Sequence, residues 1–210
     1  WLLADGNLST DGQVRMFVGE EDKEHLEYLA RLFTDAPIRK EYRKKYDRCY
    51  YGFNIKNTEI YKSLEKLGLK TRKSSRVTDL SWELIKDDQI PYSLLGMMEG
   101  DGHVAKDSNI VRLIMYRPTL ENIQKRFLDK LGIVPTAVLH DDRWNMKELC
   151  DVKFSGKDYF NLMTSLYIYT PDVKPLPRKK ERFIQNCERV ANSKSTHRKL
   201  AENCLRAVKG

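Results

Sequence analysis

An apolar run that ends in Asp-Gly constrains the fold of this chain more than any other feature. The complete run occupies residues 91–104 and reads PYSLLGMMEGDGHV. Gly96 and Gly100 lie four residues apart, so a helix here would carry two residues without side chains on one face. Such a face lets a second helix approach closely. We expect Gly102 to end this helix in the left-handed conformation that glycine adopts easily.

The residue before this glycine, Asp101, would then lie at a helix C-terminus, where unpaired carbonyls and the negative end of the dipole favour a cation. The chain opens with WLLADG, which resembles the tail of a second such run, and Asp5 occupies the matching place. Two helices of this kind packed side by side would bring two carboxylates together. Oxygen ligands of this type suit a hard cation such as Mg²⁺.

The sequence after each Asp-Gly pair follows the same order of elements. Each copy has a predicted β-hairpin, a helix, a second pair of strands and a final helix, and the first hairpin has its turn at Asp11-Gly12. We predict helices at 22–33 and 119–131, strands at 48–55 and 149–154, and helices at 58–68 and 157–166. Thr119 is the expected N-cap of its helix and Gly132 the expected stop.

The predicted fold class is therefore α+β, with two pseudo-symmetric αββαββα units whose antiparallel sheets are saddle-shaped. The expected boundaries are 1–85 for a first unit with a basic linker, 86–180 for a second unit, and 181–210 for a basic helical extension. Residues 174–180 are expected to form a stiff basic connector. Because the chain begins inside a helix pattern, we expect further residues upstream. A generic α+β protein with two incidental Asp-Gly turns remains the alternative.

Composition limits the classes of function. The net charge of +8 suits a polyanionic partner such as nucleic acid. The four cysteines form no CxxC pair, which disfavours a zinc site and is typical of reduced thiols in an intracellular, reducing compartment. Organellar, bacterial and phage-encoded origins stay open. No run is long and apolar enough to predict a membrane span, so we expect no membrane partner. P-loop and Ser/His/Asp hydrolase signatures are absent, and the histidines are scattered.

Polar residues that alternate with apolar ones on the strands would form the outer face of each sheet. A curved antiparallel sheet can enter the major groove of DNA, where Arg can bond guanine in two places and Asn or Gln can do so with adenine. Strand residues that only face solvent show the same alternation, so each candidate could also be a surface residue without a DNA contact. The candidates are Asn7, Ser9, Gln13, Arg15, Arg48, Tyr50, His103, Asn109, Arg112 and Lys153.

Residues 94–102, LLGMMEGDG, resemble the LAGLIDADG motif of homing endonucleases, and residues 1–6 resemble the end of a first copy. The resemblance implies Mg²⁺-dependent cleavage of both strands of double-stranded DNA, with cohesive ends, and the spread of a mobile intron or intein. It also implies that Mn²⁺ or Ca²⁺ can substitute in binding. Asp5 and Asp101 match the metal-binding acids of the family, and Ala4 and Gly100, which precede them, are the further predicted metal ligands.

The family also often carries a basic residue late in each unit, near the active site. Lys153 fits that place in the second unit. The matched residue of the first unit is Asn54, which departs from the pattern, and Lys56 two residues later is the expected substitute. Trp1 also departs, since the family usually has a small or aliphatic residue there.

These features together predict a monomer with pseudo-two-fold symmetry that cleaves a long, asymmetric DNA target. Two alternatives use the same scaffold: an intron maturase that binds intron RNA and assists splicing, and a DNA-binding protein without catalysis. The retained pair of aspartates favours cleavage, because RNA binding would not require two acids at helix ends.

Overall fold

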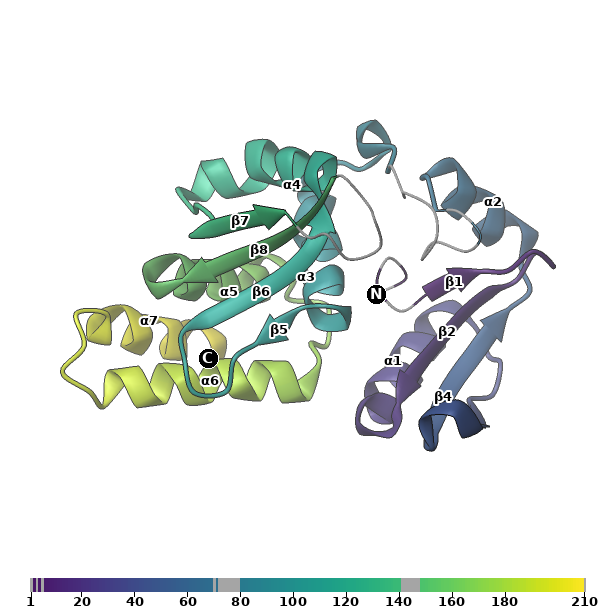
Figure 1. Ribbon diagram of the computed structural model, residues 1–210, viewed down its shortest axis with the longest axis horizontal. Coiled ribbons are helices and arrows are strands. Elements are labelled where there is room, and N and C mark those ends of the chain that lie inside the picture. The colour runs from purple at the N-terminus through teal and green to yellow at the C-terminus, as the bar shows by residue number, and fades with distance from the viewer. Residues whose placement is uncertain are drawn as a thin grey trace. The chain divides into compact units, whose positions relative to one another are not determined.

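The structure is a computed structural model that describes residues 2, 4, 6–69, 71, 80–140 and 148–209. The chain divides into two compact units, Trp1–Leu84 and Ile85–Gly210. Each unit contains one four-stranded antiparallel sheet with helices on one face (Figure 1). In the described part of the chain, no helix is long and apolar enough to cross a membrane.

The first unit follows the order ββαββα in its described residues. Its sheet has the order β1-β2-β4-β3. A left-handed Gly12, with φ of 75°, lies in the turn between β1 and β2, as the Asp-Gly pair predicts. The elements are β1 (Gly6–Leu8), β2 (Val14–Gly19), α1 (Lys23–Phe33), β3 (Arg39–Arg43), β4 (Arg48–Ile55) and α2 (Thr58–Lys66), with short 3₁₀ turns at Glu20–Asp22, Lys44–Tyr46 and Trp82–Leu84.

The second unit contains the complete predicted order αββαββα, followed by two further helices. Its sheet has the order β5-β6-β8-β7, which repeats the topology of the first sheet. The elements are α3 (Ile90–Gly100, after a 3₁₀ turn at Asp87–Gln89), β5 (His103–Val104), β6 (Ile110–Tyr116), α4 (Arg117–Ile123, continued by a π turn at Gln124–Leu128 and a 3₁₀ turn at Asp129–Leu131), β7 (Ala137–His140), β8 (Leu149–Ser155), α5 (Gly156–Tyr169), α6 (Pro177–Ala191) and α7 (Arg198–Lys209).

Each sheet buries one face and leaves the other open, because its central strands alternate. On β2 the side chains of Val14, Met16 and Val18 are buried against α1, while Arg15 and Phe17 between them point to the other face. β6 and β8 alternate in the same way, and α5 packs on their apolar face. This pattern is expected of an antiparallel sheet with one solvated side.

The C-terminal helices belong to the core of the second unit. Phe183 of α6 is fully buried and packs edge-on against Tyr159 of α5, with ring centroids 5.6 Å apart. α7 packs on both α5 and α6. Burying one such aromatic side chain stabilises the fold by about 1.5–3 kcal/mol. α6 and α7 therefore have an apolar side that fixes them to the rest of the unit.

The structure corrects three local predictions. Helix α4 begins at Arg117 with Pro118 in its first turn, so Thr119 is a buried helical residue and not the N-cap. Of the stretch 174–180 expected to be a connector, residues 174–176 lie outside any helix, but residues 177–180 already form the first turn of α6. The left-handed glycines are Gly12, Gly68, Gly132 and Gly156 in the described residues, so Gly132 stops its helix as predicted but Gly102 does not.

Candidate nucleic-acid interface and metal site

Asp101 lies exposed at the C-terminal end of α3. Its backbone N–H donates to the carbonyl of Met97 at 3.0 Å, and the N–H of Gly102 donates to the same carbonyl at 3.3 Å. The backbone of Asp101 is still helical, with φ of −93° and ψ of −11°. The helix thus continues up to this carboxylate, and the chain then turns directly into β5.

The glycine after Asp101 is required by close packing. A Cβ atom added to Gly102 would lie less than 3.0 Å from the carbonyl oxygen of Met98, which is a clash with backbone. A Cβ atom added to Gly6 would clash in the same way with the carbonyl oxygen of Leu2. The clashing carbonyl lies four residues earlier in both cases. Each glycine therefore lies against a carbonyl four residues earlier, which leaves no room for a side chain at either position.

Asp5 lies outside the described residues, so its place relative to Asp101 stays a prediction. Ala4 is half-buried in a turn, and Gly100 is the half-buried last residue of α3. The exposed Asp101 carboxylate and the Gly100 carbonyl are oxygen donors that fit a hard cation. Among the residues that the structure describes, no group of three or more His, Cys, Asp or Glu side chains could hold a metal ion.

The carbonyls at the end of α3 already have a cationic partner, which the sequence did not indicate. The ammonium group of Lys179 on α6 donates to the carbonyl oxygens of Met98, Glu99, Gly100 and Gly102 at 2.5–3.2 Å. The expectation that these carbonyls are unpaired was therefore wrong. A lysine so distant in sequence from Asp101 gives no periodic signal that would have linked the two.

The pairing register aligns the candidate residues of the two sheets one by one. In the first sheet Asn7 pairs with Arg15, and Arg15 pairs with Asn54. In the second sheet His103 pairs with Arg112, and Arg112 pairs with Lys153. Because directly paired residues share a face of an antiparallel sheet, each trio crosses three strands on the open face. The match between Asn54 and Lys153 thus agrees with the topology.

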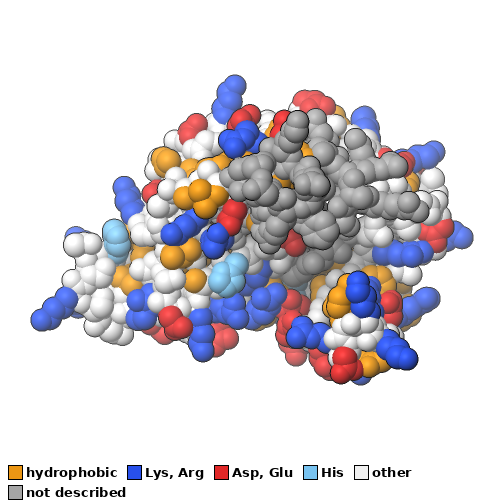
Figure 2. Space-filling model, in the orientation of Figure 1, with side chains coloured by type: hydrophobic (Ala, Val, Ile, Leu, Met, Phe, Trp, Pro, Cys, Tyr) orange, Lys and Arg blue, Asp and Glu red, His pale blue; other side chains and the backbone are white. Residues whose placement is uncertain are grey.

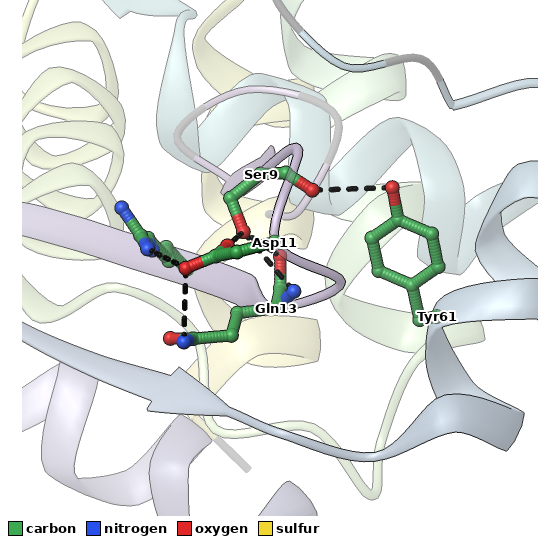
Figure 3. A network of polar contacts seen from close by, with 5 residues as sticks. Ser9, Asp11, Gln13 and Tyr61 are labelled. Atoms are coloured by element: carbon green, nitrogen blue, oxygen red, sulfur yellow. Dashed lines mark hydrogen bonds and ion pairs between the residues drawn. The ribbon is translucent and has the colours of Figure 1, made fainter.

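A polar network joins the first hairpin of the first sheet (Figure 3). Arg15 and Gln13 both donate to the Asp11 carboxylate, at 2.7 and 3.0 Å. The Ser9 hydroxyl donates to the same carboxylate and also bonds the backbone of Gln13. The Ser9 hydroxyl, followed by the Arg15 charge, lowers the pKa of Asp11. Ser9 is buried in this turn, whereas Arg15 on β2 and Gln13 just before it are half-buried.

An aromatic platform covers the other end of the same face. The Arg43 guanidinium lies 5.1 Å from the ring centre of Phe17 and 4.5 Å from that of Tyr50. The Phe17 ring occupies the space above Gly52, where a Cβ atom would clash with it. Arg48 pairs directly with Arg43 and is exposed. Phe17 and Arg43 are candidate contacts that the sequence analysis missed, although strand alternation would have placed Phe17 on this face.

The open face of the second sheet is also polar. Arg112 forms a two-point ion pair with Asp151, and His103 beside it is exposed. Asn109 lies just before β6, and its side-chain oxygen accepts from Arg189 of α6 at 2.8 Å. Lys and Arg side chains are spread over the visible face of each unit, with Asp and Glu among them (Figure 2).

The late position of the first unit and its match in the second unit carry side chains of different chemistry. Lys153 is a half-buried cation on β8, whereas Asn54 on β4 has a buried side-chain oxygen without a hydrogen-bond partner among the described residues. The predicted substitute, Lys56, is exposed and lies one residue beyond the end of β4. Because Lys56 lies outside the strand, alternation along β4 does not determine which face of the sheet its side chain takes.

No protein-family description matches this sequence, and no curated protein is similar to it. Several solved structures share its fold. The meganuclease I-SmaMI bound to uncleaveable DNA has a TM-score of 0.54 at 14% identity, covering 100% of this chain and 95% of that one. A mesophilic variant of the homing endonuclease I-DmoI has a TM-score of 0.56 at 15% identity, covering 86% and 91%.

The homing endonuclease I-WcaI bound to its DNA recognition sequence has a TM-score of 0.55 at 12% identity, covering 85% of this chain and 81% of that one. A further structure shows I-SmaMI bound to uncleaved DNA in the presence of calcium ions, with a TM-score of 0.50 at 14% identity. At this level of identity the likeness establishes the architecture, which agrees with the duplicated sheets described above. The chain therefore has the fold of the single-chain LAGLIDADG homing endonucleases.

Proposed function

We propose that this protein is a site-specific endonuclease that cleaves both strands of a long, asymmetric DNA target and leaves cohesive ends. The observation that carries the proposal is the matched pair of open sheet faces. Each face presents a trio of polar residues in the same register, and each follows an Asp-Gly pair whose glycine has no room for a Cβ atom. The solved structures of I-SmaMI and I-WcaI on DNA support a duplex as the partner of this fold.

Sequence recognition would come from the open faces. Side chains on a twisted antiparallel sheet can reach base edges in the major groove, where each base pair presents a distinct pattern. Arg15 and Arg112 are suited to guanine, and Gln13 and Asn7 to adenine. The two faces share an arginine at the central matched position but differ at the outer two, with Asn7 and Asn54 against His103 and Lys153, so each unit would read a different half-site. The target would then be an imperfect palindrome read by one monomer.

The Mg²⁺ site would be formed by the Asp5 and Asp101 carboxylates, with the Ala4 and Gly100 carbonyls as further oxygen donors. A divalent ion held there would stabilise charge on the phosphate and lower the pKa of an attacking water. Helical backbone up to Asp101 and the close turn at Gly102 keep that carboxylate at the tip of α3. The calcium-containing structure of I-SmaMI on DNA supports a divalent cation as the cofactor of this fold.

The residues late in each unit would act on the water and the phosphate. Lys153 can donate to a phosphate oxygen or orient a water, and its charge stabilises negative charge that develops during cleavage. Asn54 can orient a water but carries no charge. We therefore infer that the two halves of the active site are unequal, and that intron homing uses an enzyme with one stronger half.

A randomised duplex library tests the proposal. We expect incubation with Mg²⁺, followed by sequencing of the cut ends, to give one long consensus with staggered cuts. Asp101→Asn should abolish cleavage and leave binding unchanged, because it removes the charge that holds the metal but little shape. Asp107→Asn, an exposed acid in the following loop, is the matched control and should cut normally. Comparable cleavage by the Asp101 variant would refute the assignment.

A further inference from the structure

The first turn of α6 holds the end of α3 from which Asp101 projects. Lys179 is only 2% exposed, and its ammonium group donates to the carbonyls of Met98 at 2.8 Å, Glu99 at 2.5 Å, Gly100 at 3.2 Å and Gly102 at 2.6 Å. The backbone N–H of Leu176 also donates to the Glu99 carboxylate, at 2.6 Å. The same turn of α6 is thus tied to both the backbone and a side chain of the last turn of α3.

These contacts continue along the outer edge of β5. Because β5 is an edge strand, its outward carbonyls have no strand partner among the residues that the structure describes. Arg182 of α6 lies within 3.5 Å of the Val104 carbonyl, and Asn186 donates to the Ala105 carbonyl at 2.8 Å. One face of α6 therefore supplies donors to the backbone from the end of α3 to Ala105, the residue after β5.

A lysine is well suited to this place. Helix C-termini concentrate unpaired carbonyls and a negative partial charge, which an ammonium group neutralises. Burying a charged group is costly unless the group is hydrogen-bonded. Here four backbone carbonyls accept hydrogen bonds from the ammonium group. Two of these carbonyls belong to Gly100 and Gly102, the neighbours of Asp101 on either side. The lysine thus acts as a clamp that holds a backbone carbonyl of the residue before Asp101 and of the residue after it.

We propose that Lys179 is a positioning residue for Asp101, and that the C-terminal helices form part of the cleavage site through it. The inference rests on the proposed function only in taking Asp101 as a metal-binding acid. The clamp keeps the Gly100 carbonyl and the Asp101 carboxylate in one fixed relation. Without it the last turn of α3 would fray, since its carbonyls would lose their donor.

Charge and position have opposite effects on metal binding, which makes the role of Lys179 measurable. A positive charge beside the site repels a divalent ion, so its removal alone would lower the Mg²⁺ concentration needed for cleavage. Loss of position would raise that concentration, because the oxygen ligands would no longer be preorganised. The positioning role therefore predicts that loss of Lys179 raises the Mg²⁺ concentration needed for cleavage.

The test compares Lys179→Met with Lys199→Met, which removes the same charge from an exposed residue of α7. We expect the Lys179 variant to speed amide exchange at Asp101 and Gly102 at least about tenfold, since local opening of this turn becomes cheaper. Its half-saturating Mg²⁺ concentration should rise several-fold, with DNA affinity like that of the Lys199 variant. The exchange of β6 and β8 amides reports whether the rest of the unit stays folded.

Unchanged exchange at Asp101 and Gly102, or a lower Mg²⁺ requirement, would overturn the inference. Exchange is measured without cleavage, so faster exchange in Lys179→Met, combined with a wild-type protein that cuts no duplex, would refute the endonuclease proposal alone. If Lys179→Met does not fold, Lys179→Arg replaces it. A planar guanidinium cannot meet the same set of carbonyls, so this variant should also exchange faster at the two amides. Wild-type exchange in the Arg variant would again contradict the clamp.

Discussion

At the scale of single residues, Arg15 and Arg112 offer the clearest comparison between the two units. Each lies on the second strand of its sheet and is held by an acid: Arg15 by Asp11 at 2.7 Å, and Arg112 by Asp151 through two bonds. The acid orders a long side chain and leaves other guanidinium donors for a base. Each ion pair thus favours one direction of the arginine side chain before DNA binds.

We predict that Arg15→Ala relaxes base preference at one position of the target and that Arg112→Ala relaxes it at another, at a matched distance from the centre. Each change should cost about 1–3 kcal/mol of discrimination if the contact is with guanine. Selection from the randomised library measures both positions. Arg→Lys at each site keeps the charge but loses the two-point contact, so it should relax the same position. Unchanged base preferences would show that these arginines do not read the target sequence.

Residue-level prediction from sequence succeeded where strand alternation decides the outcome. Arg15, Arg112, Asn54 and Lys153 lie on the open faces because each follows or precedes a buried residue. It failed where a contact joins distant segments. The stack of Arg43 on Phe17 and Tyr50 joins three strands, and the bonds of Lys179 join α6 to α3. No local pattern encodes such contacts.

At the scale of elements, the two kinds of helix-ending glycine differ in their physical cause. Gly132 ends its helix with φ of 61°, and a Cβ atom there would meet nothing within 4 Å. Gly102 lies outside the left-handed region, and a Cβ atom there would clash with the backbone of Met98. The first glycine is needed for its conformation and the second for space. Sequence alone indicated a glycine stop in both cases but could not separate these reasons.

This difference predicts different responses to substitution. Gly102→Ala should lower the free energy of unfolding by about 1–3 kcal/mol, because the backbone must shift to admit the methyl group. Gly132→Asn should cost less, since asparagine tolerates the left-handed region and the site is open. Urea denaturation of both variants measures the two losses. A larger loss for the Gly132 variant would show that conformation, not space, dominates at these helix ends.

At the scale of the whole molecule, the internal repeat made the topology predictable. The same order of hairpin, helix, strand pair and helix in each half gave the two sheets, with strand orders β1-β2-β4-β3 and β5-β6-β8-β7. The role of the last two helices was not predictable from their charge, because a charged face is the usual state of a surface helix. Their apolar residues, such as Phe183 and Cys187, are buried in the second unit.

The net charge of +8 leads to a prediction about binding that is independent of catalysis. Cations that neutralise phosphates release counterions, so the binding constant should fall linearly with salt on a logarithmic scale. A protein that makes 6–10 phosphate contacts loses roughly 10³–10⁵-fold in affinity between 50 and 200 mM salt, and we expect a loss in this range. Fluorescence anisotropy with Asp101→Asn measures it without cutting. A flat response would exclude broad phosphate contact. The same salt slope in Lys179→Met would show that this buried lysine neutralises no phosphate and acts on the protein alone, whereas a slope lower by about one charge would reveal a phosphate contact.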